Sequence, residues 1–167
     1  MATKKLTIER LHQLLTYDPE TGLFSWNALP GRGRIHRAGL ISGAGQPSTG
    51  GYLTIRVDGH LHRAHRLAWY YVHGEWPATI DHINRVKTDN RLSNLRPANR
   101  LQQSWNAKKS SRGSYPKGVW KKRDKFCAEI QVHGVKHRLG VFSTPEAAHA
   151  AYSEAARQHF GDFASTG

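Results

Sequence analysis

The sequence is poor in cysteine, in acidic residues and in long apolar runs. Its single cysteine, Cys127, excludes a disulfide within the chain and any zinc site built on cysteines. No apolar run approaches the roughly 20 residues that cross a membrane, and the first residues lack the uninterrupted apolar segment of a secretory signal. We therefore expect a cytoplasmic, intracellular protein that does not act at a membrane.

Acidic residues are few beside the basic ones. The 167 residues include 25 Lys and Arg against 12 Asp and Glu, which gives a formal net charge of +13. A basic excess of this size indicates a polyanionic partner, and nucleic acid is the leading candidate. An anionic membrane surface is disfavoured because the sequence has no long basic amphipathic helix. The length allows one ordinary domain or two small ones.

Residues 81–106 carry the groups best suited to chemistry. They begin with an adjacent carboxylate and imidazole, Asp81 and His82, and continue with a loop rich in Asn and Asp. The pattern predicts a strand, this loop, a second strand and then a helix. A carboxylate can bind a divalent ion and an imidazole can take a proton from water, so the pair suits metal-assisted hydrolysis of a phosphodiester.

The preceding part of the chain alternates short elements. Apolar spacing predicts a helix over residues 6–15, and a strand over residues 23–26 follows a turn. Residues 52–63 have the pattern of a hairpin with an Asp-Gly turn. A helix is predicted over residues 64–73, where we expect His65 to have a structural role, bonding a neighbouring backbone group. The side chains predicted to face inward from this helix are Leu67, Ala68, Tyr71 and Val72.

Between the strand and the hairpin, residues 30–51 are rich in glycine and carry Arg32, Arg34 and Arg37. Glycine at this density disfavours a packed element and predicts a mobile basic loop. Two interpretations stay open: a solvated linker, or an arm whose arginines follow a phosphate backbone.

Several strings between residues 17 and 109 together resemble the HNH endonucleases, in the form found in phage and intron-encoded homing enzymes. They are YDPETGLFSW, GYLTIRVDG, AHRLAWYYVHGEWP, IDHIN, DNRLSNLRPA and WNAKK. The resemblance implies a ββα-metal nuclease core in which Asp81 binds Mg²⁺ or Mn²⁺ and His82 is the general base. It further implies that Asn94 holds the loop and orients His82, and it suggests a phage or mobile-element origin.

The helix after the second strand departs from that family pattern. The last motif position is usually Asn or His and supplies a second metal ligand, whereas here it is Gln103. Its carbonyl lies one methylene further out, and Mg²⁺ demands near-ideal octahedral geometry. Asn99 and Asn106, at helical spacings from it, are alternative ligands. The departure leaves two functions open, an active enzyme and a weakened, binding-only descendant.

A second module is predicted after a basic linker. Its pattern predicts three antiparallel strands and then a helix capped by Thr144, with Pro145 at its first position and Gly161 at its end. The strings KGVWKKRDKFCAEIQV and HRLGVFSTPEAAHAAYSEAARQHFG resemble the APETALA-type (ethylene-responsive-factor) DNA-binding domain. That resemblance implies a sheet lying in the major groove of duplex DNA.

The side chains expected at DNA are mostly basic or polar, which suits contact with phosphates and base edges. The resemblance assigns the sheet residues Trp120, Lys121, Arg123, Lys125, Glu129, Gln131 and Arg138. Charge alone adds Lys108, Lys109, Arg112 and Lys117 around the linker. The alternative is that this polar face is only solvated.

Together these patterns predict an α+β protein in four segments: an N-terminal extension (1–50), a nuclease core (51–109), a linker (110–116) and a DNA-binding domain (117–167). The leading hypothesis is a metal-dependent DNA endonuclease of homing type that nicks or cuts duplex DNA, as a monomer or a homodimer. The alternative is a catalytically weakened DNA-binding regulator. An RNA-binding protein is disfavoured, because the C-terminal module lacks paired aromatic residues for stacking on single strands.

Overall fold

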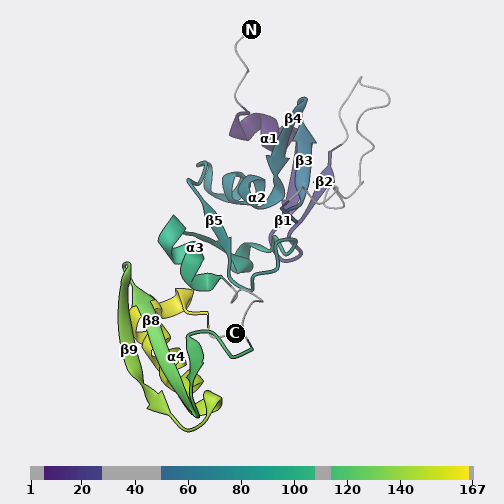
Figure 1. Ribbon diagram of the computed structural model, residues 1–167. Coiled ribbons are helices and arrows are strands. Elements are labelled where there is room, and N and C mark those ends of the chain that lie inside the picture. Colours follow the sequence, from purple (N-terminus) through teal and green to yellow (C-terminus); the bar gives the residue numbers. More distant parts are fainter. Residues whose placement is uncertain (1–5, 28–49, 108–113, 166–167) are drawn as a thin grey trace. The chain divides into compact units, whose positions relative to one another are not determined.

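The computed structural model describes residues 6–27, 50–107 and 114–165, which divide between two compact units, residues 1–99 and 100–167 (Figure 1). Most of the predicted glycine-rich arm and most of the predicted linker lie outside the described residues. So do the basic residues assigned to them, Arg32, Arg34, Arg37, Lys108, Lys109 and Arg112. In the part of the chain that is described, no helix is long and apolar enough to span a membrane.

The first unit begins with helix α1 (Ile8–Leu14) and the hairpin of β1 (Leu15–Asp18) and β2 (Leu23–Trp26). The helix and β2 were predicted, but the sequence interpretation had a turn where Tyr17 lies in β1. Leu15 and Tyr17 alternate with exposed neighbours and face the core, where Tyr17 contacts Phe24 at 4.8 Å between ring centroids. Tertiary burial thus makes a strand of a segment too short to show a period in the sequence.

A second hairpin pairs β3 (Thr54–Val57) with β4 (His60–Arg63), and helix α2 (Ala64–His73) follows it directly. The predicted Asp-Gly turn is confirmed, because Asp58 and Gly59 both have positive φ, as a two-residue hairpin turn of this kind requires. In α2 the inward prediction is wrong for one side chain. Val72 is 45% exposed, whereas Tyr70 is buried because the indole of Trp76 stacks on it at 4.3 Å.

The core of the first unit gathers side chains from α1, β1, β2, β3 and α2. The short strands β5 (Ile80–His82) and β6 (Leu95–Pro97) pair antiparallel, and the single turn η1 (Leu92–Asn94) leads into β6. Ile80 and Leu95 join the core, which fixes this strand pair to the rest of the unit. The fully or nearly fully buried members include Leu11, Leu14, Leu15, Phe24, Val57, Leu67 and Ala68.

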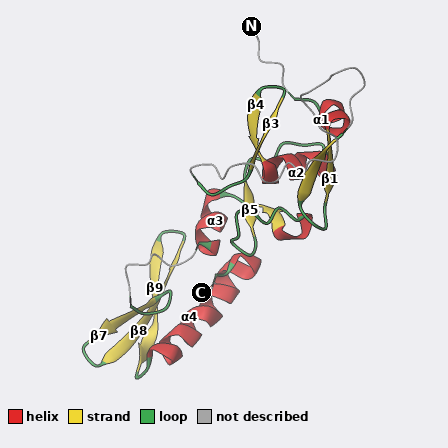
Figure 2. Cartoon of the chain, turned by 90° about the vertical axis from the view of Figure 1, so that its right-hand side faces the viewer, coloured by secondary structure: helices red, strands yellow, loops and turns green. Residues whose placement is uncertain are grey.

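The second unit is built on a three-stranded antiparallel sheet in the order β7 (Val119–Lys122), β8 (Lys125–Val132), β9 (Val135–Phe142). Helix α4 (Pro145–Phe160) packs on this sheet, and the turn η2 (Gly161–Phe163) follows it (Figure 2). The three strands and the helix with both of its ends were predicted and are confirmed. Thr144 caps α4 by accepting a hydrogen bond from the Ala147 N–H at 3.2 Å.

Helix α3 (Arg100–Asn106) belongs to the second unit, because the division falls after Asn99. The indole of Trp105 stacks on Phe160, with 4.6 Å between ring centroids. Lys117 Nζ donates hydrogen bonds to the carbonyls of Trp105 and Ala107, each at 2.9 Å. The sequence interpretation had grouped this helix with residues 51–109 and put the boundary at 110–116. In the structure the division falls earlier, because Trp105 joins α3 to the second unit through its contact with Phe160. The local sequence pattern does not indicate this contact.

Candidate active site

Asp81 and His82 lie on β5, where the register with β6 sets their surroundings. Asp81 is opposite Arg96 and His82 is opposite Leu95. Side chains alternate between the faces of a strand, so His82 turns into the unit beside Ile80 and is only 4% exposed, while Asp81 lies on the other side. The adjacent carboxylate and imidazole therefore have different environments.

Asp81 is held by the guanidinium of Arg96. Arg96 Nε and a terminal nitrogen both donate to Asp81 Oδ2, at 3.1 and 2.8 Å. The two side chains are only 12% and 13% exposed, so water screens this ion pair poorly. The guanidinium of Arg96 therefore occupies a position next to Asp81, the predicted metal ligand.

His82 is positioned by Asn90, since Nε2 lies 3.2 Å from Asn90 Oδ1. An amide oxygen only accepts hydrogen bonds, so this contact puts the proton on Nε2 and the ring's lone pair on Nδ1. Burial lowers the pKa of His82, and the hydrogen bond to Asn90 and the charge of Asp81 oppose that shift only in part. The ring is therefore neutral at neutral pH, which is the form that can accept a proton.

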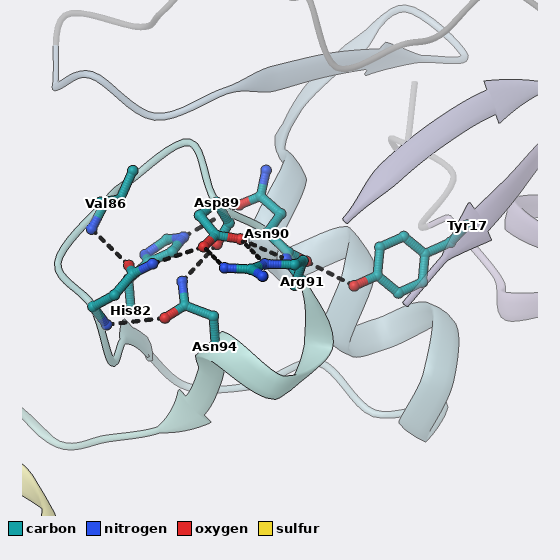
Figure 3. Close-up of polar contacts among 8 residues, drawn as sticks. Tyr17, His82, Val86, Asp89, Asn90, Arg91 and Asn94 are labelled. Carbon is teal, nitrogen blue, oxygen red and sulfur yellow. Dashed lines mark hydrogen bonds and ion pairs between the residues drawn. The ribbon is translucent and has the colours of Figure 1, made fainter. Parts of the chain in front are cut away.

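The loop between β5 and η1 is braced by Asn94 (Figure 3). Asn94 Oδ1 accepts the Asn84 N–H at 2.9 Å, and Asn94 Nδ2 donates to the Asp89 carbonyl at 2.8 Å. One side chain thereby joins the two halves of the loop. These contacts are compatible with the predicted role of Asn94 in holding the loop, which stays a prediction. Its predicted orientation of His82 also stays a prediction, since the hydrogen bond described for the His82 ring runs to Asn90.

A carboxylate and a tyrosine complete the bracing of this loop. Asp89 accepts two hydrogen bonds from the Arg91 guanidinium, at 2.8 and 2.6 Å, and a third from Asn84 Nδ2 at 2.7 Å. The Arg91 hydrogen bond is the main reason why the pKa of Asp89 falls to about 2. Tyr17 donates its hydroxyl to the Asn90 carbonyl at 2.7 Å, which ties the loop to the core (Figure 3). The residue that binds His82 is therefore itself fixed.

Aromatic rings surround His82 on the inside of the unit. The His65 ring stands edge-on to it, with 5.0 Å between centroids and 79° between planes. Tyr52 lies 5.0 Å from His65 and 5.9 Å from His82. Two cations approach the Tyr52 ring, the Arg63 guanidinium at 4.8 Å and the Lys87 ammonium at 4.9 Å. The candidate base thus sits in a cluster of rings with positive charge at its rim.

The two predicted metal ligands, Asp81 and Gln103, belong to different units of the structure. Among the residues that the structure describes, no group of three or more His, Cys, Asp and Glu is placed to hold a metal ion. Gln103, the second predicted ligand, is half-buried on α3 in the second unit, whereas Asp81 belongs to the first. Its role as a ligand stays a prediction.

The predicted DNA-contacting residues of the sheet are mostly exposed. Trp120 is 41% exposed, and Lys121, Arg123, Lys125, Gln131 and Arg138 are exposed as well. Glu129 is half-buried and pairs with Lys136 at 3.3 Å. Lys117, which was also predicted to contact DNA, is half-buried. Its ammonium group donates to the two carbonyls near the end of α3.

Sequence reasoning missed the roles of several neighbours of Asp81 and His82. Arg96 was recoverable, because pairing the two predicted strands around their loop brings it opposite Asp81. Asn90 is one of the Asn and Asp residues of the predicted loop, and its bond to His82 depends on the path of that loop. The contacts of Tyr52 and His65 join segments far apart in the sequence, and no local pattern indicates them.

Comparison with known proteins finds similar sequences for part of the chain. Residues 62–104 match the family model described as HNH endonuclease. A relative named "Uncharacterized HNH endonuclease L560", from Acanthamoeba polyphaga mimivirus, is 35% identical over 96 residues, which are 56% of this chain and 50% of that protein. The chain thus spans about half the length of this curated relative. No solved structure matches. The chain is therefore similar to HNH endonucleases over part of its length, and the mixed fold with its small antiparallel sheets is compatible with an HNH domain.

Proposed function

We propose, with the similarity to HNH endonucleases as the premise, that this chain is a metal-dependent endonuclease that hydrolyses phosphodiester bonds of duplex DNA. One observation carries the proposal most directly. His82 lies within the matched segment, buried and neutral, with its Nε2 fixed by Asn90 at 3.2 Å. A fixed neutral imidazole is what a general base needs before it takes a proton from water.

The groups around His82 have distinct parts in this proposal. His82 Nδ1 accepts the proton of the attacking water. Asn90 keeps the ring in one tautomer, and Asn94 keeps the loop that carries Asn90 in one shape. Preorganisation of this kind contributes to rate, because the reacting groups need not be ordered again in each turnover.

Asp81 is the residue that would hold Mg²⁺ or Mn²⁺, with Gln103 as the further ligand that the family resemblance adds. The donor set fits Mg²⁺ in kind, since this ion is commonly bound through one or two carboxylates and keeps several waters. When bound, the ion would neutralise charge on the phosphate and on the leaving oxygen. It would share the Asp81 carboxylate with Arg96.

The exposed face of the β7–β9 sheet is proposed to position the duplex. Trp120 is exposed on β7, and the exposed cations Lys121, Arg123 and Lys125 lie along β7, in the turn that follows and at the start of β8. Long cations of this kind bind phosphates and guanine edges. The APETALA-type resemblance supports the same face. A homing-type enzyme from a phage or mobile element fits these features and the viral source of the relative.

The test is conversion of supercoiled plasmid DNA to open circle in Mg²⁺, in Mn²⁺ and in EDTA. Wild type is expected to nick with either ion and not in EDTA, and His82→Ala is expected to lose nicking. His60→Ala is the matched control, because His60 is an exposed histidine of the same unit at a hairpin turn. Gln103→Asn is assayed in parallel and tests whether Gln103 serves as a metal ligand. Equal nicking by wild type and His82→Ala would rule out this site.

The second candidate is a DNA-binding regulator with a dormant nuclease core. The ion pair between Asp81 and Arg96 favours it, because the candidate metal ligand already has a cation. Binding to DNA that is as tight in EDTA as in Mg²⁺, without nicking under any ion, would support this candidate. Nicking that appears only in Gln103→Asn would identify the helix position as the missing ligand. Metal-dependent nicking by wild type would exclude the regulator.

A further inference from the structure

His65 is a buried histidine with an unusual environment. It lies in the first turn of α2 and is 3% exposed. Burial, and to a smaller extent the charges of His82, Arg63 and Arg66, lower its pKa to about 3, so the ring is neutral. Its Nδ1 is buried without a hydrogen-bond partner among the described residues. A polar ring in such a place costs stability that an apolar ring of the same shape would not.

The contacts of His65 lead to the candidate base. Its ring edge meets the His82 ring at 5.0 Å with 79° between the planes, which is the favoured edge-to-face geometry. Tyr52 contacts both rings, and the cations of Arg63 and Lys87 flank Tyr52 in turn. His82 is therefore contacted by the rings of His65 and Tyr52 and bonded by Asn90.

We propose that His65 is a positioning residue for the hydrolytic reaction: its flat ring holds the His82 imidazole in the orientation that proton abstraction requires. This inference rests on the proposed function. His65 itself does not touch the reacting atoms. The hydrogen bond to Asn90 holds Nε2, and the edge-to-face neighbour restricts turning of the His82 ring about the axis of that bond. The shape of the His65 ring, and not its nitrogen, carries the effect.

A pair of variants separates ring shape from volume. His65→Phe keeps a flat ring and removes the unpartnered nitrogen, whereas His65→Leu fills similar volume without a flat ring. His62→Leu is the matched control, since His62 is a partly buried histidine of the same unit that stacks on Trp76 at 5.7 Å. Thermal unfolding is recorded for each variant. Should His65→Leu not fold, His65→Met, an adaptable side chain of similar volume, takes its place.

Two measurements report on positioning. ¹⁵N NMR of the His82 ring gives its tautomer, and plasmid nicking at saturating Mg²⁺ gives kcat and KM. We expect His65→Phe to keep the wild-type His82 tautomer and kcat. His65→Leu is expected to show mixed His82 tautomers and a kcat lower by about 100-fold, with KM unchanged, because small misplacements of a catalytic group have effects of this size. His62→Leu is expected to behave as wild type in both.

Two outcomes would overturn the inference. A wild-type His82 spectrum and kcat in His65→Leu would mean that the ring has no positioning role. Equal loss in His65→Phe and His65→Leu would assign the effect to the nitrogen. If wild-type protein does not nick DNA at all, the proposed function fails, but the NMR comparison still decides whether His65 fixes the His82 ring.

Discussion

The two candidate functions differ in the partner of the Asp81 carboxylate, which is a metal ion in the nuclease and Arg96 in the regulator. This carboxylate is nearly buried and bound by Arg96 at 2.8 Å. In a low-dielectric setting, removal of one partner leaves the other charge uncompensated, whereas removal of both is much less costly. A divalent ion can compensate the carboxylate in place of the guanidinium. Whether it does so can be measured without any DNA.

Arg96→Met is expected to lower the free energy of unfolding by about 3 kcal/mol, because it leaves the buried Asp81 charge without its partner. Addition of Mg²⁺ should restore part of this loss and raise the Tm of Arg96→Met more than that of wild type, since the ion replaces the missing cation. Urea denaturation and thermal unfolding with and without Mg²⁺ give both quantities.

The control for this prediction is the double variant Asp81→Asn with Arg96→Met, which keeps the size of the site without either charge. It should be more stable than Arg96→Met alone and should not respond to Mg²⁺. An identical response of both variants to Mg²⁺ would mean that the ion binds elsewhere, and Asp81 would lose its proposed role.

At the scale of elements, the loop between β5 and η1 depends on the charge of Asp89. Its pKa of about 2 in the folded protein is below the ordinary value of about 3.9. A depressed carboxyl pKa contributes stability that is fully present above the unfolded value and is lost as the pH falls through the folded value. The contribution should therefore decline below about pH 5 and be lost as the pH falls through about 2.

Asp89→Asn tests this contribution, because it removes the titrating charge and keeps the size of the side chain. The difference in free energy of unfolding between wild type and Asp89→Asn should be constant above about pH 5 and should shrink towards pH 2. Chemical denaturation at a series of pH values measures it. A difference that does not change with pH would show that the Arg91 ion pair adds nothing to stability.

The approach of β7 to α4 depends on Gly118. Its φ is +77°, and a Cβ at this position would collide with the ring of Tyr152. Gly118→Ala is therefore expected to destabilise the second unit by about 2 kcal/mol or more, through overpacking and a strained backbone. Gly134→Ala is the matched control. Gly134 has φ +84° and open space around it, so only the backbone term of about 1 kcal/mol applies. Thermal unfolding of both variants compares them, and equal losses would contradict the collision.

The elements that the sequence predicted well are those with a strong local signal. Helix α4 has a cap, a proline and a terminal glycine, and the two hairpins around Asp58 and His133 have turn chemistry at the right place. Strand β1 and the burial of Tyr70 were missed because partners distant in sequence determine them. The site follows the same division. Asp81 and His82 were found from their residue types, whereas Asn90 and His65 became neighbours only through the fold.

At the scale of the whole molecule, the net charge of +13 predicts that electrostatics dominates any binding to DNA. Cations that neutralise phosphates release bound counterions, so the logarithm of the binding constant falls linearly with the logarithm of salt concentration. The slope of this line is proportional to the number of phosphates that the protein neutralises. It therefore tests which surface is used, independently of whether the DNA is cut.

Lys121→Ala and Lys125→Ala are each expected to weaken DNA binding and to reduce the salt slope by about 1, because each removes one exposed cation from the proposed DNA-facing sheet. Arg157→Ala makes the same change of charge on α4, where Arg157 pairs with Glu154 at 3.0 Å. It should leave the slope unchanged if the sheet, and not the helix, faces the phosphates. Binding is measured in EDTA by fluorescence anisotropy of a labelled duplex over a range of salt concentrations. An equal drop in slope for Arg157→Ala would mean that net charge alone attracts DNA, and the sheet would lose its assigned role in positioning the duplex for His82.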